Sequence, residues 1–348
     1  PALLQFWVSR LRHRHRWCRP VPLVADGDIP VALPQPLAGL ELFEIDADWV
    51  TPGRPVPLGV VHDRAAHLVT AVLRVHGDGQ FSLVDEHDQE LRCDGWGSAL
   101  GGFARERGDV VRVAWKDWSA PVPVSDQIGR LEVRWADEEP SGARQSYLEL
   151  MHAVAPKVTD HDLLIEVSVA VGTRRTRRSG PPLHAAIDTL SDELDLFRDR
   201  LENASLQVGS VLSAADIAHA VRGRSDPVAM EQLATLRQSL AAAVGAAAPT
   251  FGPFHLAESI DHVAVDRSVH RSWWFSRWPR REVPAGWLDM LMFDTGCTRS
   301  ITMVFEPIPP SRSDHAVDRE LVKREANIES RHRRGFRVTG KDRKALGE

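Results

Sequence analysis

The alternation of apolar and polar residues predicts strands and helices that follow one another along most of the chain. A run rich in Val and Leu predicts a strand at 67–76, and further strands are predicted at 110–118, 162–171 and 298–306. Apolar residues at helical spacing predict helices over 85–107, 142–155, 183–203 and 227–244. Strands interleaved with helices, together with hairpin signals, favour an α+β fold with two or more layers in which helices cover antiparallel sheets.

Two of the predicted helices carry a clear set of core positions. In the helix over 85–107 the expected core contacts are Leu91, Trp96, Leu100 and Phe103. In the helix over 183–203 one stripe holds Ile187, Leu190, Leu194, Phe197 and Leu201. A short helix is expected to begin after Ser213, because serine caps helices well and an acidic residue follows at Asp216.

Turn and proline signals fill in the remaining elements. Gly77-Asp78-Gly79 predicts a tight turn, with Phe81–Asp85 returning as the second strand of a hairpin. Residues 20–60 are rich in proline and predict an extended linker with one short strand near Leu40–Ile45. Nearer the other end we expect paired strands at 260–266 and 269–278, a short helix over 284–292, and a charged helix over 314–334.

These patterns divide the chain into five segments. They are a basic segment at 1–20, a Pro-rich linker at 21–60, a first α+β unit at 61–130, a second α+β unit with a helical insertion at 131–310, and a charged helix and tail at 311–348.

Charge is distributed unevenly along the sequence. The net charge is -5, yet residues 1–20 carry five arginines and no acid, and residues 310–348 carry eleven Lys/Arg against seven Asp/Glu. The stretch between them is therefore strongly acidic. An acidic body argues against nucleic acid as a partner, whereas the basic ends fit contact with an anionic membrane surface.

The first residues favour a position at a membrane. Pro1–Val8 is apolar and contains Trp7, and five arginines follow between Arg10 and Arg19. An interfacial Trp followed by basic residues is typical of the cytoplasmic end of a membrane helix, although a disordered basic arm has the same composition. Three widely spaced cysteines form no disulfide framework, which fits a reducing compartment. We therefore expect the chain at the cytoplasmic face of the cell membrane.

The sequence offers no convincing catalytic, cofactor or metal site. It has no phosphate-binding loop and no His-Glu-x-x-His pair. Asp160-His161-Asp162 contains ligand types, but neighbouring side chains of a strand point to opposite faces and rarely converge on one ion. Asp261, His262 and His270 could suggest acid–base chemistry, but surface polar residues are the better explanation at strand spacing. We expect a protein without enzymatic activity and without a cofactor.

The most distinctive segment lies between residues 271 and 288, where tryptophans alternate with arginines. Its candidate interface residues are Arg271, Trp273, Trp274, Arg277, Trp278, Arg280, Arg281 and Trp287. Three interpretations fit this composition: indoles buried in the core, a hot spot for a protein or membrane partner, and a surface that stacks nucleic-acid bases.

Several short motifs resemble one known family. They are Trp278-Pro279-Arg280, Val283-Pro284, Trp287-Leu288, Val304-Phe305-Glu306-Pro307-Ile308-Pro309-Pro310, Thr70–Val75, Gly95-Trp96-Gly97 and Val111–Trp115. Together they resemble actinobacterial conjugative-element proteins that are anchored in the membrane. They are also similar to the EccE component of type VII secretion and to the non-ATPase N-terminal region of type IV secretion ATPases.

The resemblance implies a structural component of a conjugation or secretion apparatus, with a conjugation or secretion ATPase and membrane components as partners. It supplies no catalytic residues. The alternative is a nucleic-acid-handling accessory protein of conjugative DNA transfer, and a hydrolase with an unrecognised site is a third class.

Overall fold

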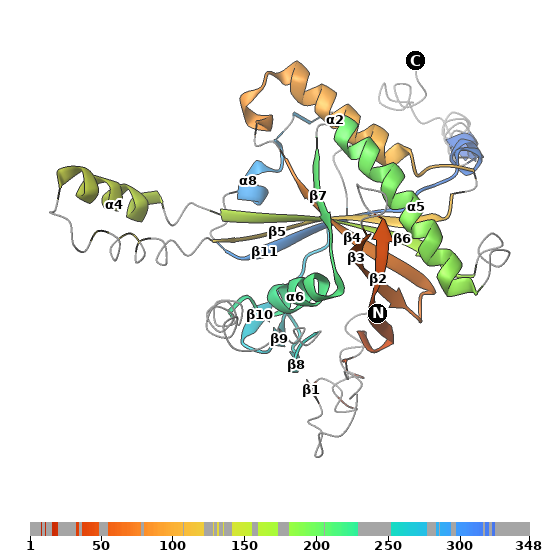
Figure 1. Cartoon of the computed structure of the whole chain (residues 1–348), viewed down its shortest axis with the longest axis horizontal. Coiled ribbons are helices and arrows are strands. Elements are labelled where there is room, and N and C mark those ends of the chain that lie inside the picture. The colour runs from red at the N-terminus through yellow and green to blue at the C-terminus, as the bar shows by residue number, and fades with distance from the viewer. Residues whose placement is uncertain are drawn as a thin grey trace, which may run out of the picture.

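The computed structural model describes residues 8, 11, 16–19, 33–34, 37–48, 55–77, 80–106, 108–121, 128, 131, 135, 141–154, 159–172, 181–204, 206–228, 252–276, 283–284, 286–293, 297–315, 317–319 and 322–323. Their strands are β1 (Arg16–Cys18), β2 (Leu40–Asp48), β3 (Pro55–Asp63), β4 (Leu68–His76), β5 (Val110–Pro121), β6 (Thr159–Ala170), β7 (Gln207–Val211), β8 (His255–Glu258), β9 (Val263–Val265), β10 (Ser268–His270) and β11 (Arg299–Phe305). Their α-helices include α2 (Glu86–Gly101), α4 (Gly142–Val154), α5 (Pro182–Asn203), α6 (Ala214–Ser225) and α8 (Asp289–Phe293), and 3-10 turns span Leu37–Gly39 and Phe81–Leu83 (Figure 1).

These elements confirm the expected α+β class. A large antiparallel sheet has the strand order β11-β5-β6-β4-β3-β2, with β7 paired to β4 beside that path. A smaller antiparallel sheet has the order β1-β8-β9-β10. The large sheet takes strands from both α+β units expected from the sequence, so the boundary near residue 130 does not separate two sheets.

One edge of β4 is shared by two strands. β3 pairs with its first half up to Ala71, and β7 pairs with its second half from Leu73 onward. Leu212 lies at the fork, where its N–H donates to the Val72 carbonyl at 2.9 Å and its own carbonyl accepts from the Gly59 N–H at 2.8 Å. The sheet therefore splits without leaving these backbone groups unsatisfied.

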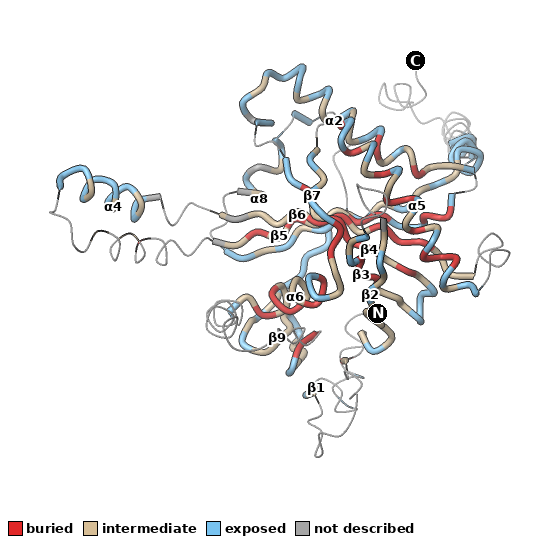
Figure 2. The backbone as a smooth tube through the Cα atoms, in the orientation of Figure 1, coloured by how far each residue is buried: buried red, intermediate tan, exposed pale blue. Residues whose placement is uncertain are grey.

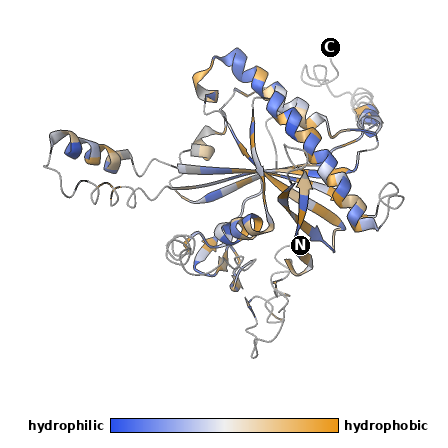
Figure 3. Cartoon of the chain, viewed as in Figure 1, coloured by the Kyte–Doolittle hydropathy of each residue, from blue (hydrophilic) through white to orange (hydrophobic). Residues whose placement is uncertain are grey.

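Helices α2 and α5 cover one face of the large sheet. Alternate residues of β4 and β6 point to this face and are aliphatic: Val69, Ala71, Leu73, Val75, Ile165, Val167 and Val169. The predicted stripe of α5 packs against them, and all five of its residues are buried. Phe103 and Phe197 meet at a ring-centroid distance of 4.7 Å between α5 and the loop after α2. Figures 2 and 3 show α5 buried and apolar along one side only.

Helix α6 covers part of the opposite face, where Ile217 packs with Val72, Leu164 and Leu212. Ser213 caps the helix as expected: its hydroxyl accepts from the Asp216 N–H at 3.1 Å, and the Asp216 carboxylate accepts from the Ser213 N–H at 3.2 Å. This reciprocal pair satisfies two donors at the helix start.

Helix α6 begins directly over β3, and the contact leaves no room for a side chain on Gly59. A Cβ atom there would lie 2.6 Å from the Ala214 nitrogen and 2.6 Å from the Ser213 carbonyl carbon. Both are backbone atoms, so they cannot swing aside as the end of a flexible side chain would.

Helix α4 lies away from both sheets, as Figure 1 shows. Its Tyr147 ring meets Trp135 edge-on, and Arg144 lies over the same indole at 5.2 Å from its centroid. Among the helices that the structure describes, none combines the length and the apolar character needed to cross a membrane.

Two sequence-based predictions about strands were wrong. Residues 81–83 form a 3-10 turn instead of a returning strand, and Asp85 then caps α2 by accepting from the Asp88 N–H at 2.9 Å. The edges of β4 are occupied by β3, β6 and β7, which leaves no place for a hairpin partner after Gly77. The expected linker contains β2 and β3, whose valines and leucines pair over nine residues despite the prolines nearby.

Other boundaries moved by a few residues. Helix α2 ends at Gly101 instead of near 107, and Leu91 on it is exposed although we expected a core contact, while Trp96, Leu100 and Phe103 do pack as predicted. The strands β9 and β10 pair as expected but are short. Most of the helix expected over 227–244 and most of the basic segment at 1–20 lie outside the described residues. Residues 314–315, 317–319 and 322–323 are helical as predicted, but the helix begins at Pro310, earlier than expected.

Candidate functional site

The small sheet is held to α6 by one aspartate. Asp266 has a φ of 50°, a left-handed conformation that aspartate tolerates better than most residues. Its carboxylate accepts from the His255 N–H at 2.7 Å and the Phe254 N–H at 3.0 Å, and it forms an ion pair with Arg222 of α6. The Arg222 guanidinium also lies over the Phe254 ring, 4.8 Å from its centroid.

Strand β10 is tied to the end of the same helix. The Ser268 hydroxyl donates to Asp226 at 2.7 Å, and the His270 Nε2–H donates to the Ser225 carbonyl at 2.7 Å. The strand thus ends at a fixed point, and Arg271 is the first residue of the predicted interface segment beyond it.

Residues 271–276 leave this anchor without regular secondary structure, and each of them is exposed. Trp273 is 79% exposed and Trp274 is 89% exposed, and Phe275 beside them is also exposed. Core packing therefore does not account for the two indoles. Large exposed aromatic groups are uncommon on soluble surfaces unless they belong to a binding site.

A polar group borders these aromatic residues. Arg271 forms an ion pair with Asp261, whose carboxylate also contacts His262 Nδ1 at 2.7 Å. The hydrogen bond from His262, followed by the one from Arg271, lowers the pKa of Asp261. Because His270 binds the Ser225 carbonyl instead, the three side chains considered for acid–base chemistry do not form one set.

The remaining interface candidates are not all in the same place. Trp287 lies at the turn before α8 and is partly exposed. Figure 1 shows α8, the helix that follows Trp287, and β10, the strand that precedes residues 271–276, on opposite sides of the large sheet. Arg277, Trp278, Arg280 and Arg281 lie outside the described residues.

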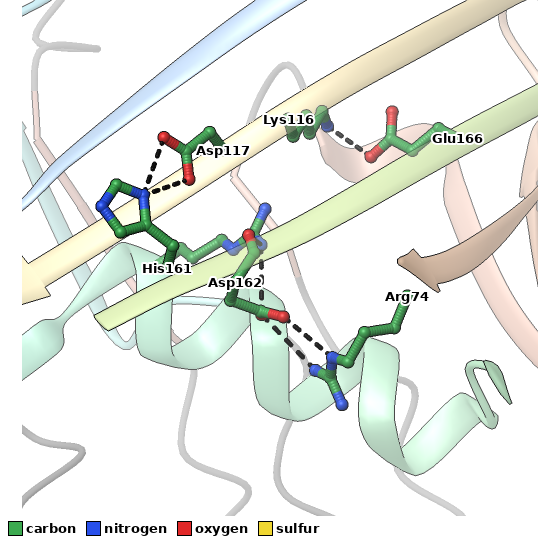
Figure 4. Close-up of polar contacts among 7 residues, drawn as sticks. Arg74, Lys116, Asp117, His161, Asp162 and Glu166 are labelled. Carbon is green, nitrogen blue, oxygen red and sulfur yellow. Dashed lines mark hydrogen bonds and ion pairs between the residues drawn. The ribbon is translucent and has the colours of Figure 1, made fainter. Parts of the chain in front are cut away.

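The Asp160-His161-Asp162 motif divides between the two faces of the large sheet. Figure 4 shows His161 turned to Asp117, with Nδ1 3.0 Å from Oδ1, while Asp162 reaches Arg74 on β4 at 2.8 Å. The alternation of β6 thus separates the two side chains, as expected for neighbours on a strand. Among the described residues, no three His, Cys, Asp or Glu side chains gather as metal ligands.

A charged cluster that the sequence interpretation missed lies on the face beside α6. Asp162 holds two guanidinium groups, those of Arg74 at 2.8 Å and Arg224 at 3.3 Å. Lys116 on β5 forms an ion pair with Glu166 on β6 (Figure 4). Burial lowers the pKa of Arg224, and the charge of Asp162 opposes that effect.

A sequence signal for this cluster does exist. Arg74, Lys116 and Glu166 are charged residues flanked by apolar core positions of their strands, and each occupies the parity opposite to those positions. Such a pattern predicts a polar face. Which strands lie side by side could not be read from it, because the contacts join residues up to 88 positions apart.

Comparison with protein-family models and with curated proteins finds no match to this chain.

Proposed function

We propose that this chain is a non-catalytic structural component of a conjugation or secretion apparatus, positioned at the cytoplasmic face of the cell membrane. Its role would be to dock a membrane-associated transfer ATPase. The motifs at 70–75, 95–97, 111–115 and 278–310 support this proposal through their resemblance to membrane-anchored conjugation proteins.

The observation that carries the proposal is the exposure of Trp273 and Trp274 beside a fixed anchor. Tryptophan and arginine are the residue types most enriched at interface hot spots. Because β10 is bonded to α6, the segment that carries these indoles starts from a fixed point.

The partner surface expected here is apolar at its centre with an acidic rim. Two indoles require apolar pockets on the partner. Arg271 would contribute a cation at the edge when a partner carboxylate joins or replaces Asp261 in its ion pair. A cytoplasmic ATPase domain with aliphatic side chains bordered by carboxylates fits this description.

A photo-crosslinking amino acid at position 274 of the full chain tests the proposal in cells that contain the apparatus. We expect a covalent adduct with the transfer ATPase, identified by mass spectrometry. The same probe at position 83 is the control, because Leu83 is comparably exposed at 81% but lies in the turn before α2.

The variant Trp273→Ser/Trp274→Ser should weaken ATPase binding by about thirtyfold or more, since one hot-spot residue contributes ~2 kcal/mol. Leu83→Ser should leave binding unchanged. Equal adducts from positions 274 and 83, or full binding by the double variant, would overturn the assignment.

Absence of turnover is the second arm of the test. The purified chain should release no phosphate from ATP or GTP, whereas an ordinary enzyme turns over at roughly 10 per second. Hydrolysis that persists through repurification and maps to this chain would contradict a purely structural role.

Nucleic-acid handling is the second candidate, because exposed indoles next to arginine also stack bases. Single-stranded DNA binding that falls steeply with salt, and that is lost in the same double variant, would favour it over ATPase docking. The acidic middle of the chain argues against it.

A further inference from the structure

A cavity of about 330 Å³ lies between α6, the small sheet and the charged face of the large sheet. This volume is at the lower end of the roughly 300–1,000 Å³ typical of small-molecule sites. Its walls are contributed by β4, β5, β6, α6, β9 and β10, elements held together by the bonds of Asp266, Ser268 and His270.

One wall of the cavity is aliphatic. It is formed by Val72, Leu164, Leu212, Ile217, Val221 and Val265. Five of these residues belong to the buried cluster under α6 or pack against it directly. A ligand lying on this wall would contact hydrocarbon from strands and helix alike, which favours an apolar body.

The other wall is charged: Lys116, Glu166 and Arg224 line it, and Arg74 and Asp162 adjoin Arg224 outside the lining. Lys116 is balanced by Glu166, whereas the single carboxylate of Asp162 faces both Arg74 and Arg224. One positive charge of this cluster therefore lacks a counter-charge among these five side chains.

One hydrogen-bond donor on this wall also lacks an acceptor. Arg224 lines the cavity, and its Nε–H is buried with no partner among the residues that the structure describes. A buried donor without an acceptor is unfavourable, so the Arg224 side chain would gain by turning this N–H toward an acceptor oxygen placed in the cavity.

We propose that this cavity is a binding site for a small amphipathic carboxylate, with its carboxylate at Arg224 and Lys116 and its hydrocarbon on the aliphatic wall. The excess positive charge selects an anion over a cation. The aliphatic wall selects a chain over a bare anion such as acetate. The site is separate from the indole surface proposed for docking.

Isothermal titration calorimetry of the full chain with octanoate tests this proposal. We expect saturable binding with one site per chain. Octylamine, which has the same chain with a cationic head, and acetate, which has the head without the chain, should give no saturable heat. Octylamine binding as well as octanoate would overturn the assignment of the charged wall.

Three variants locate the site. Arg224→Met should weaken octanoate binding by about tenfold or more, because a hydrogen bond to a charged group is lost together with its charge. Ala220→Phe should abolish binding, because Ala220 lines the cavity and a benzyl group would fill it. Arg64→Met is the matched control, since Arg64 is exposed on the turn after β3. This variant should bind octanoate as the unaltered chain does.

Hydrogen exchange of the unaltered chain tests the site without any variant, so its result does not depend on whether a variant folds. Octanoate should slow exchange in peptides from α6 and from β5 around Lys116, and leave the α2 and α5 peptides unchanged. Absence of saturable binding, undiminished binding by folded Ala220→Phe, or protection confined to other elements would each overturn the proposal.

Discussion

On the face of the large sheet under α5, the inward positions of β4 from Val69 to Val75 are aliphatic and buried. On the opposite face the same strand presents Thr70, Val72 and Arg74. The Thr70 hydroxyl forms a hydrogen bond with the Ser168 hydroxyl at 2.8 Å. The first face is covered mainly by apolar contacts, with two ion pairs, Arg105–Glu193 and His161–Asp117, beside them. The second face is covered by α6 with a smaller apolar cluster, and it carries the ion pairs of Arg74, Lys116 and Arg224 and the cavity. Burial of apolar area therefore contributes more to the first face than to the second.

The largest effect should come from breaking the first face. Phe197→Ala removes a fully buried ring that packs on Phe103, and we expect a loss of about 3–5 kcal/mol in the free energy of unfolding. Urea denaturation measures this loss. Leu196→Ala on the exposed side of α5 is the control and should change stability by less than ~0.5 kcal/mol. Similar losses from both variants would contradict the packing described for α5.

The next effect concerns the approach of α6 to β3. Gly59→Ala places a methyl group against two backbone atoms at 2.6 Å, so α6 must shift, at about 1–3 kcal/mol. Gly97→Ala in α2 is the control, because no atom lies within 4 Å and alanine should stabilise that helix by ~0.5–1 kcal/mol.

Hydrogen exchange on the Gly59→Ala protein sharpens the comparison. Amides of α6 should exchange faster while those of α5 stay protected. If α5 loses protection to the same extent, the two faces unfold as one unit and the contrast between them does not extend to stability.

A third change removes the charge shared by two arginines. Asp162→Asn leaves Arg74 and Arg224 facing each other, and we expect a loss of about 1–2 kcal/mol, less than for fully buried ion pairs because these groups are partly exposed. Thermal unfolding monitored by circular dichroism gives the measurement. A stability gain would show that the cluster is repulsive overall.

A smaller effect is expected at the start of α6. Ser213→Ala removes the side-chain acceptor of the capping box and should cost about 1 kcal/mol. Ser213→Asn should stay close to the unaltered protein, because asparagine caps as well as serine. Equal losses in the two variants would mean that the cap itself does not stabilise α6.

The smallest effect is a pH dependence at Asp195 on α5. Desolvation raises the pKa of this carboxyl in the folded protein, opposed by Arg198. Its contribution to stability is therefore full at low pH and is lost as the pH rises through the folded pKa. Asp195→Asn should flatten that part of the pH profile, by at most a few tenths of a kcal/mol after solvent screening. An unchanged profile in urea titrations would contradict this direction.

Local patterns predicted the elements whose signals lie within one segment. These elements are the apolar stripe of α5, the cap at Ser213 and the strands β4, β5 and β6. Each is predicted by residues that are close together in the sequence. The 3-10 turn at 81–83 was missed because Phe81 and Leu83 have strand-like propensity, and the competing cap at Asp85 decides the structure.

The sites depended on contacts that no local pattern contains. On the second face, Arg74, Lys116, Glu166 and Arg224 lie close together because of the order of the strands in the sheet. That order cannot be read from the sequence. The Trp-Arg segment was singled out from its composition, but the positions of β10 and α8, on opposite sides of the large sheet, could not be predicted from it. In each case tertiary arrangement decided which residues share a surface.

The edge of β5 that pairs with β11 stays unpaired for a long time during synthesis. Its partner β11 is made about 180 residues after β5 ends, so at the roughly 5–20 residues per second of translation this edge stays uncovered for on the order of 10–40 s. Unpaired edges of that length attract other strands. Chains that end before Arg299 would therefore keep an unpaired β5 edge that includes Trp115. We expect such truncated chains to bind chaperones or aggregate more readily than the full-length chain.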